Sequence, residues 1–214
     1  MNNSDTLKKI YNHLLSTFGP CNWWPGDSPF EVIIGAILTQ NTNWSNVEKA
    51  IQNLKQANLL APEKINEIDT AEFAELIKPA GYFNVKSKRI KKFMEWLFEN
   101  YDGDLSMMFD QDLGILRGEL LSVNGIGPET ADSILLYAGD KPTFVVDAYT
   151  HRIFSRHGLI SEDSSYHETK EFFEDNLPED VALYNEYHAL IVQVGKEYCK
   201  PKKKCDKCPL NIFL

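Results

Sequence analysis

The stretch that most constrains the fold of this 214-residue chain runs from residue 121 to residue 147. Gly125-Ile126-Gly127 sets two glycines around one apolar residue, which permits a tight hairpin between two helices. Pro128 then suits the first position of the second helix, where its fixed φ is favourable and its missing N–H had no partner. N–H groups at a helix start attract anions, so this turn suits a phosphate; the alternative is a plain connector.

A carboxylate follows shortly after this hairpin. The apolar run from Thr143 to Val146 ends abruptly in Asp147, and a helical pattern begins at Ala148. A carboxylate at the end of a buried segment is costly unless it is paired or used in chemistry. Asp147 is therefore the candidate working carboxylate.

Hydrophobic periodicity along the rest of the chain predicts helices, with no convincing strand pair, internal repeat or low-complexity linker. Ser4 is expected to cap the first helix. Two short helices are expected within 62–78, and the other expected ranges are 4–17, 30–38, 44–57, 85–101, 105–117, 128–138, 148–157, 164–177 and 181–198. The sequence therefore predicts an all-α protein.

The order of hairpin, loop and aspartate in LLSVNGIGPETAD and KPTFVVDAYTHRIF resembles the signature of the endonuclease III superfamily of DNA glycosylases. The resemblance covers nearly the whole chain and implies two helical lobes with a DNA-binding cleft between them. It implies a single glycosylase unit over 1–214, with lobe one at about 25–135, lobe two at about 1–24 plus 136–198, and a cysteine-rich loop at 199–214.

The formal charge of -9, from 22 basic and 31 acidic residues, has the wrong sign for a simple electrostatic DNA binder. Any DNA-binding surface must therefore be local, and two basic groups are candidates, although either could be a solvated face. These groups are Lys86, Lys88, Arg89, Lys91 and Lys92, and Lys196, Lys200, Lys202, Lys203 and Lys204. No signal region or membrane span is apparent, so we expect a cytoplasmic monomer that contacts no membrane.

The resemblance also implies which residues meet double-stranded DNA that carries a damaged base. Gln40 matches the family residue that enters the DNA near the displaced base, and the loop at Asn84 matches a segment that approaches the backbone. The predicted DNA-contacting residues are Gln40, Asn84, Lys86, Gly125, Ile126, Gly127 and Thr130.

The resemblance has a consequence for the reaction as well. In bifunctional members of the family a lysine stands two places after the second hairpin glycine and forms a Schiff base with the sugar. Glu129 occupies that place here and cannot form an imine. The prediction is hydrolysis of the N-glycosidic bond without AP-lyase activity, with Asp147 stabilising oxocarbenium charge or positioning water.

The expected base pocket contains Trp23, Trp24, Trp44 and Glu129. Stacking and cation–π contact with tryptophan would favour a flat, cationic ring, and alkylated purines such as 3-methyladenine fit that description. These tryptophans could instead be core residues. Two other functions stay open: a glycosylase for oxidised pyrimidines or mispaired bases, and a non-catalytic helix-hairpin-helix DNA-binding protein.

Three cysteines in the last part of the sequence, Cys199, Cys205 and Cys208, have the spacing C-x5-C-x2-C. They resemble the family's 4Fe–4S loop, but the place of a fourth cysteine holds Leu214. A cluster with an unusual fourth ligand, a zinc ion, no metal and a disulfide all stay open. Cys21 is expected to be a buried or pocket thiol and not the missing ligand.

Overall fold

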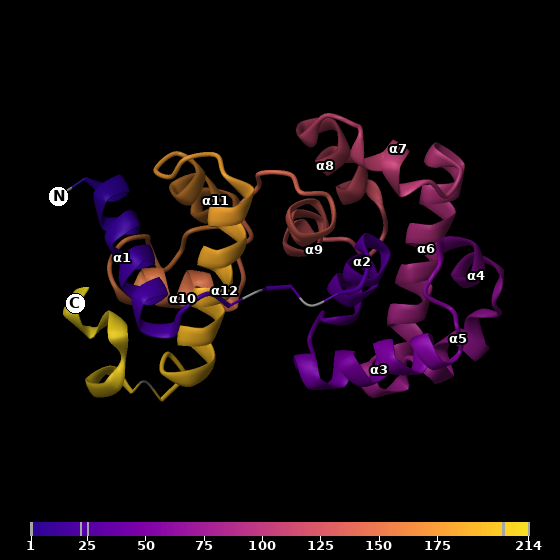
Figure 1. The fold of residues 1–214 in the computed structure, drawn as a ribbon, viewed down its shortest axis with the longest axis horizontal. Helices are drawn as coiled ribbons and strands as arrows, with labels where there is room; N and C mark the ends of the chain where they lie inside the picture. The colour runs from indigo at the N-terminus through magenta and orange to yellow at the C-terminus, as the bar shows by residue number, and fades with distance from the viewer. Residues whose placement is uncertain (1, 22, 25, 203, 214) are drawn as a thin grey trace. The chain divides into compact units, whose positions relative to one another are not determined.

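The computed structural model describes residues 2–21, 23–24, 26–202 and 204–213 (Figure 1). These ranges contain helices and no β-strand, so the predicted all-α class is confirmed. The chain divides into two compact units: unit 1 comprises Met1–Trp24 and Asp140–Leu214, and unit 2 comprises Pro25–Gly139. None of the helices in the described ranges is long and apolar enough to cross a bilayer.

Unit 2 is built around an almost wholly buried helix, α2. Every residue of α2 from Phe30 to Leu38 is buried, as expected of a helix that is apolar on all sides. Ser28 caps it and Pro29 takes its first position. Around α2 pack α3, α6, α9 and η2. The elements are α2 (Pro29–Leu38), α3 (Trp44–Gln56), α4 (Pro62–Glu67), α5 (Thr70–Leu76), η1 (Lys78–Ala80), α6 (Phe83–Tyr101), α7 (Leu105–Phe109), α8 (Leu113–Ser122), α9 (Pro128–Ser133) and η2 (Ile134–Ala138).

Unit 1 has an aromatic core centred on α12, which packs against α1 and α10. The rings of Phe144 and Phe173 stack at 4.0 Å, and Tyr187 lies edge-on to both. The Tyr187 hydroxyl donates a 2.9 Å hydrogen bond to the carbonyl of Leu7, tying α12 to the N-terminal helix. The elements are α1 (Asn3–Phe18), α10 (Ala148–Arg156), α11 (Tyr166–Glu174), α12 (Val181–Glu197), η3 (Cys205–Lys207) and η4 (Pro209–Phe213).

Several predicted helix limits were wrong, and three of them are explained by a capping interaction or turn. The first helix is capped by Asn2 and not by Ser4. Helix α6 begins at Phe83, so Asn84 lies in its first turn and not in the preceding loop. The range 105–117 contains two helices because the carboxylate of Asp112 accepts backbone N–H groups and starts α8.

The second helix of the hairpin changes geometry halfway along. Its first part, α9, is α-helical, but Ile134–Ala138 forms a π-helical turn that ends when the N–H of Gly139 reaches back to the carbonyl of Ile134 at 3.1 Å. Such turns are rare and are often found near functional sites. The sequence predicts the extent of this helix, 128–138, but not the wider turn.

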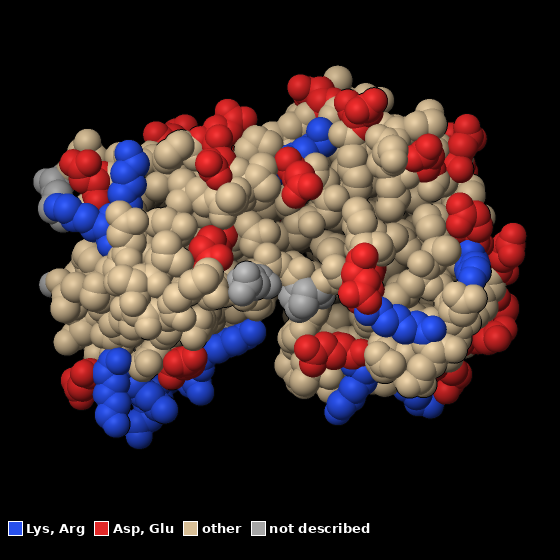
Figure 2. All heavy atoms as spheres, in the orientation of Figure 1, with Lys and Arg blue, Asp and Glu red and all other residues tan. Residues whose placement is uncertain are grey.

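Charged side chains are unevenly distributed over the surface. Figure 2 shows Lys and Arg gathering over the C-terminal segment, which is yellow in Figure 1. Exposed members of this C-terminal lysine group are Lys196, Lys200, Lys202, Lys204 and Lys207. Lys203, which belongs to the predicted basic group, lies outside the described residues.

Candidate active site

Asp147 lies at the start of α10, where it is the N-cap residue. Its Oδ1 accepts hydrogen bonds from the backbone N–H of Thr150 at 2.7 Å and from the Thr150 hydroxyl at 2.9 Å. The side chain is 13% exposed, so it is mostly but not completely buried. Because the positive end of the helix dipole meets this carboxylate, the position favours an anion.

A histidine that the sequence analysis did not select faces the same carboxylate. His188, on α12, places its Nε2 3.7 Å from Asp147 Oδ2, and its own side chain is 6% exposed. Burial opposes ionisation of Asp147, but the contact with His188 and the hydrogen bonds from Thr150 outweigh it and lower the pKa of the carboxyl. Asp147 is therefore held as an anion near neutral pH. Only the fold could bring residues 147 and 188 together, since the sequence offers no spacing rule for such a pair.

In unit 2 the structure brings together Gln40 and the hairpin. The Gln40 amide donates to the carbonyl of Gly125 at 3.0 Å and to the hydroxyl of Thr130 at 2.9 Å. Arg89 in turn donates to the Gln40 side-chain oxygen. Both ends of the Gln40 amide are thus engaged within unit 2, where they fix the end of α2 against the hairpin. Its predicted insertion into DNA stays a prediction.

The two hairpin glycines have different surroundings. Gly125 has φ +95°, and a Cβ there would lie 2.4 Å from Arg89 Cγ. Gly127 has φ -94°, and a Cβ there would meet nothing within 4 Å. Ile126 between them is buried, and its N–H donates to the carbonyl of Val123 at 3.0 Å. Ile126 therefore stabilises the turn, and open space for a ligand lies at Gly127.

Lys86 is not the DNA-contacting residue that the sequence predicts. Its side chain is 1% exposed, and its ammonium donates to the carbonyls of Leu38 and Ala80 at 2.8 Å each. Lys86 thus closes the ends of two segments inside unit 2, where a phosphate cannot reach it. Asn84 is exposed in the first turn of α6, which leaves its predicted contact open.

The four residues of the predicted base pocket belong to different units. Trp23 and Trp24, in unit 1, meet edge-on with ring centroids 5.9 Å apart, whereas half-buried Trp44 and exposed Glu129 belong to unit 2. Their convergence on one pocket stays a prediction. The Lys196 ammonium lies 5.3 Å from the Trp23 ring centroid, so this ring already has a cation partner.

Cys21 lies apart from the other three cysteines. It lines a hollow of about 240 Å³ together with Trp23, Gln193 and Lys196. Burial, with the charge of Glu186, raises the pKa of the Cys21 thiol to about 11. A thiol of that kind is inert near neutral pH and is a poor metal ligand.

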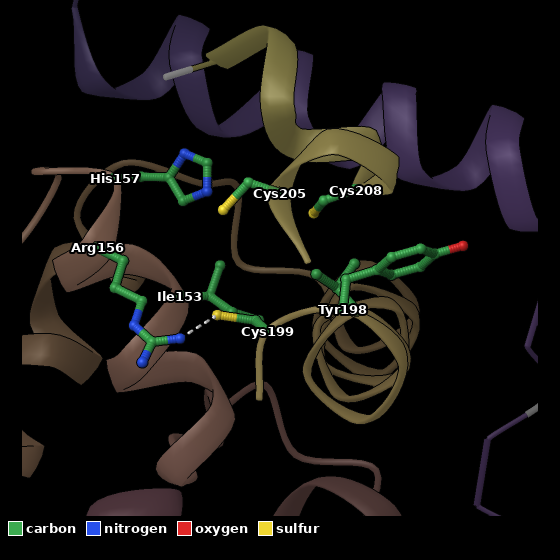
Figure 3. A pocket seen from close by; sticks show the side chains of 8 residues that line it. Ile153, Arg156, His157, Tyr198, Cys199, Cys205 and Cys208 are labelled. Atoms are coloured by element: carbon green, nitrogen blue, oxygen red, sulfur yellow. Dashed lines mark hydrogen bonds between the residues drawn. The ribbon is translucent and has the colours of Figure 1, made fainter. Parts of the chain in front are cut away.

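Cys199, Cys205 and Cys208 converge on a second, more enclosed pocket, of about 30 Å³ (Figure 3). His157 and Arg156, from the end of α10, line the same pocket. All four cysteines of the chain are free thiols, so the disulfide alternative is not realised. Burial and the charges of Cys199 and Cys205 raise the pKa of the Cys208 thiol, with partial opposition from a backbone hydrogen bond.

The donors in this pocket are of the kind that iron and zinc prefer, three thiols and an imidazole. The Nδ1 of His157 is buried and makes no hydrogen bond of normal geometry with the described residues. Burial lowers the pKa of this imidazole, opposed in part by the backbone of Phe213, so the neutral, metal-binding form is favoured. In the described ranges, however, no three such groups already stand close enough to hold one metal ion.

The helix-hairpin-helix and the aspartate that follows it both lie in the part of the sequence that a family model of base excision DNA repair proteins matches. The chain belongs to the HhH-GPD superfamily of base excision DNA repair proteins, whose family model matches residues 34–179. It is a DNA glycosylase of that superfamily.

Individual relatives agree with this assignment. A Methanocaldococcus jannaschii protein named "Putative DNA repair glycosylase MJ1434" is 53% identical over 213 residues, covering 99% of this chain and 97% of its own. Endonuclease III of Thermotoga maritima is 31% identical over 184 residues, covering 86% and 81%. The structure of H. pylori 3-methyladenine DNA glycosylase (MagIII) bound to 1,N6-ethenoadenine superposes with TM-score 0.79 at 29% identity, covering 92% of this chain and 98% of that one.

Proposed function

We propose that the protein is a monofunctional DNA N-glycosylase in which Asp147 is the catalytic carboxylate. The observation that carries the proposal is the geometry of this carboxylate. Thr150 fixes one oxygen, and the other faces His188 3.7 Å away. The anion is thus oriented without being fully covered.

A fixed anion of this kind has a defined use in base removal. As the N-glycosidic bond breaks, positive charge develops on the deoxyribose ring, and a preorganised carboxylate stabilises that charge. The same carboxylate can orient the attacking water. His188 and Thr150 keep the carboxylate ionised and in place, so it need not reorganise during the reaction.

The proposed substrate is double-stranded DNA with an alkylated purine, such as 3-methyladenine, flipped out of the helix. Support comes from the half-buried tryptophans Trp23, Trp24 and Trp44 and from the similarity to a 3-methyladenine glycosylase. Endonuclease III relatives above 30% identity favour a second candidate, removal of oxidised pyrimidines. Phosphates of the DNA backbone would approach the open side of the hairpin at Gly127 and the exposed Asn84.

We infer from Glu129 that the protein has no AP-lyase activity. This residue is exposed in the first turn of α9, where the bifunctional pattern would have a lysine. Reduction with borohydride in the presence of abasic DNA would trap a Schiff base if another amine performed the attack. We expect no covalent complex.

The test is base release from duplexes that each carry one damaged base: 3-methyladenine, an oxidised pyrimidine, uracil or a mispaired adenine. We expect release of the alkylated purine, and loss of at least about a hundredfold in rate for Asp147→Asn. Asparagine is also a good N-cap, so this variant should stay folded. Asp180→Asn, at the N-cap of α12, is the matched control and should keep full activity.

The outcomes separate the parts of the proposal. Release of another base with the same dependence on Asp147 would refute the substrate class alone. An active Asp147→Asn variant would refute the role of Asp147. DNA binding without release of any base would refute glycosylase activity on these lesions.

A further inference from the structure

The pocket lined by Cys199, Cys205 and Cys208, here called the C-terminal pocket, has three cysteines. The iron–sulfur loop that this segment resembles has four. Cys21 cannot supply the fourth ligand, because it lines a different hollow in unit 1. The position that matches the fourth cysteine of the family's loop holds Leu214. A protein donor from another element that lines the pocket would complete the set.

His157 is the candidate donor. It follows the last residue of α10 and is placed there by the helix end, where its N–H reaches the carbonyl of Ile153. Figure 3 shows its imidazole directed toward the sulfur of Cys205, across the pocket from Cys199 and Cys208. The nitrogen nearer to Cys205 in Figure 3 is Nε2, whereas Nδ1 is directed away from the cysteines. The backbone of Phe213 acts on this imidazole, and a backbone contact on one ring nitrogen orients the other nitrogen of a metal-binding histidine.

The end of α10 is also fastened to the cysteine segment. Arg152 donates to the carbonyl of Cys199 at 2.8 Å. Arg156 donates to the Cys199 sulfur at 3.3 Å and to the carbonyl of Lys200 at 2.9 Å. Guanidinium groups beside a sulfur stabilise the thiolate, which is the form that binds metal. The contacts hold His157 and Cys199 in a fixed relation.

Three thiols and an imidazole can bind either a lone zinc ion or an iron–sulfur cluster. A lone zinc ion requires its four donors around one point. In a 4Fe–4S cluster each protein ligand binds a different iron atom, so the ligands stand farther apart around a shared centre. Histidine replaces cysteine at iron in other iron–sulfur centres.

We propose that His157 is the fourth protein ligand of a 4Fe–4S cluster whose other ligands are Cys199, Cys205 and Cys208. The three thiols lose their protons on binding, and the imidazole binds as the neutral ring. Replacing one thiolate by a neutral ligand makes the cluster less negative, which raises its reduction potential relative to the all-cysteine form.

The experiment reconstitutes the 214-residue protein anaerobically with equal amounts of ferrous and ferric iron and with sulfide. Iron and zinc are then measured, together with the pulsed EPR spectrum of the reduced cluster. We expect the wild-type protein to hold the cluster, with nitrogen coupling from an imidazole. His157→Cys should keep the cluster, lose the nitrogen coupling and show a lower reduction potential. His157→Ala should lose iron to a chelator about ten times faster or more.

Controls separate ligation from folding. His167→Ala removes an exposed histidine on α11, 72% exposed at its side chain, and should match wild type in every readout. Circular dichroism establishes that each variant is folded. The proposal is overturned if the wild-type cluster shows no nitrogen coupling, if His157→Ala holds it equally well, or if the wild-type chain takes up only zinc or no metal. None of these readouts depends on DNA or on glycosylase activity.

Discussion

The two hairpin glycines provide a matched pair of substitutions whose expected costs in stability differ several-fold. At Gly125, with φ +95°, any residue with a Cβ is strained, at a cost of about 1–3 kcal/mol. The added Cβ would also lie 2.4 Å from Arg89 Cγ and 2.7 Å from Arg89 Cδ. Arg89 must therefore move away, which breaks its hydrogen bond to Gln40.

Losing a hydrogen bond from a charged donor costs about 1.5–3 kcal/mol. Together with the backbone strain, Gly125→Ala should lower the free energy of unfolding by about 2.5–6 kcal/mol. In a chain of this length, each kcal/mol shifts the melting temperature by about 2–4 °C. In Gly127→Ala the added Cβ would have no neighbour within 4 Å. Gly127 is the N-cap of α9, and replacing a glycine cap by alanine should lower the free energy of unfolding by less than about 1 kcal/mol.

Urea unfolding of the three proteins, followed by circular dichroism, measures the difference. DNA binding by fluorescence anisotropy, measured below the unfolding range, gives a second readout. Gly127→Ala should be stable yet bind DNA more weakly, since its methyl group fills the open side of the turn. Equal stability of the two variants would refute the account of Gly125 as the residue that this turn requires.

Three further predictions concern charged groups. His188→Gln should slow base release and move the acid limb of its pH–rate profile to higher pH, because without the imidazole contact burial raises the pKa of Asp147. Burial and a neighbouring guanidinium lower the pKa of Lys86 from 10.5 to about 8, so the unfolded chain binds more protons between those values. The free energy of unfolding of the wild-type protein should therefore rise between about pH 8 and 10.5, as measured by urea unfolding. The free energy of unfolding of Lys86→Met should show no such rise. Asp132→Asn weakens the buried ion pair with Arg117 in the hairpin and should cost about 3–5 kcal/mol, measured by thermal unfolding.

Much of the fold could be predicted because it depends on local patterns. The apolar run after Ser28, the Gly-x-Gly turn and Pro128 each define an element from a few neighbouring residues. The errors arose where two local signals compete. Asn2 and Ser4 are both good caps, and only the structure shows that Asn2 accepts the bond from the third helical residue.

The site was less predictable because its contacts join residues distant in sequence. Lys86 belongs to a run of basic residues, but its position on α6 turns its ammonium into the interior to meet two main-chain carbonyls. Its neighbour Lys88 is exposed, as the charge pattern suggests. Sequence alone cannot tell which side chain of a basic helix faces inward when the buried partners are carbonyls and not acids.

The position of Asp147 explains how one side chain can serve both the fold and the proposed reaction. As the N-cap of α10, it contributes about 1 kcal/mol to the stability of unit 1 through its Oδ1. The helix start and Thr150 lessen the cost of keeping a mostly buried charge, and the other oxygen is left for chemistry. An alanine at this position would remove both functions, whereas asparagine retains the cap and removes only the charge. Loss of activity in a stable Asp147→Asn variant would therefore assign the reaction to the charge.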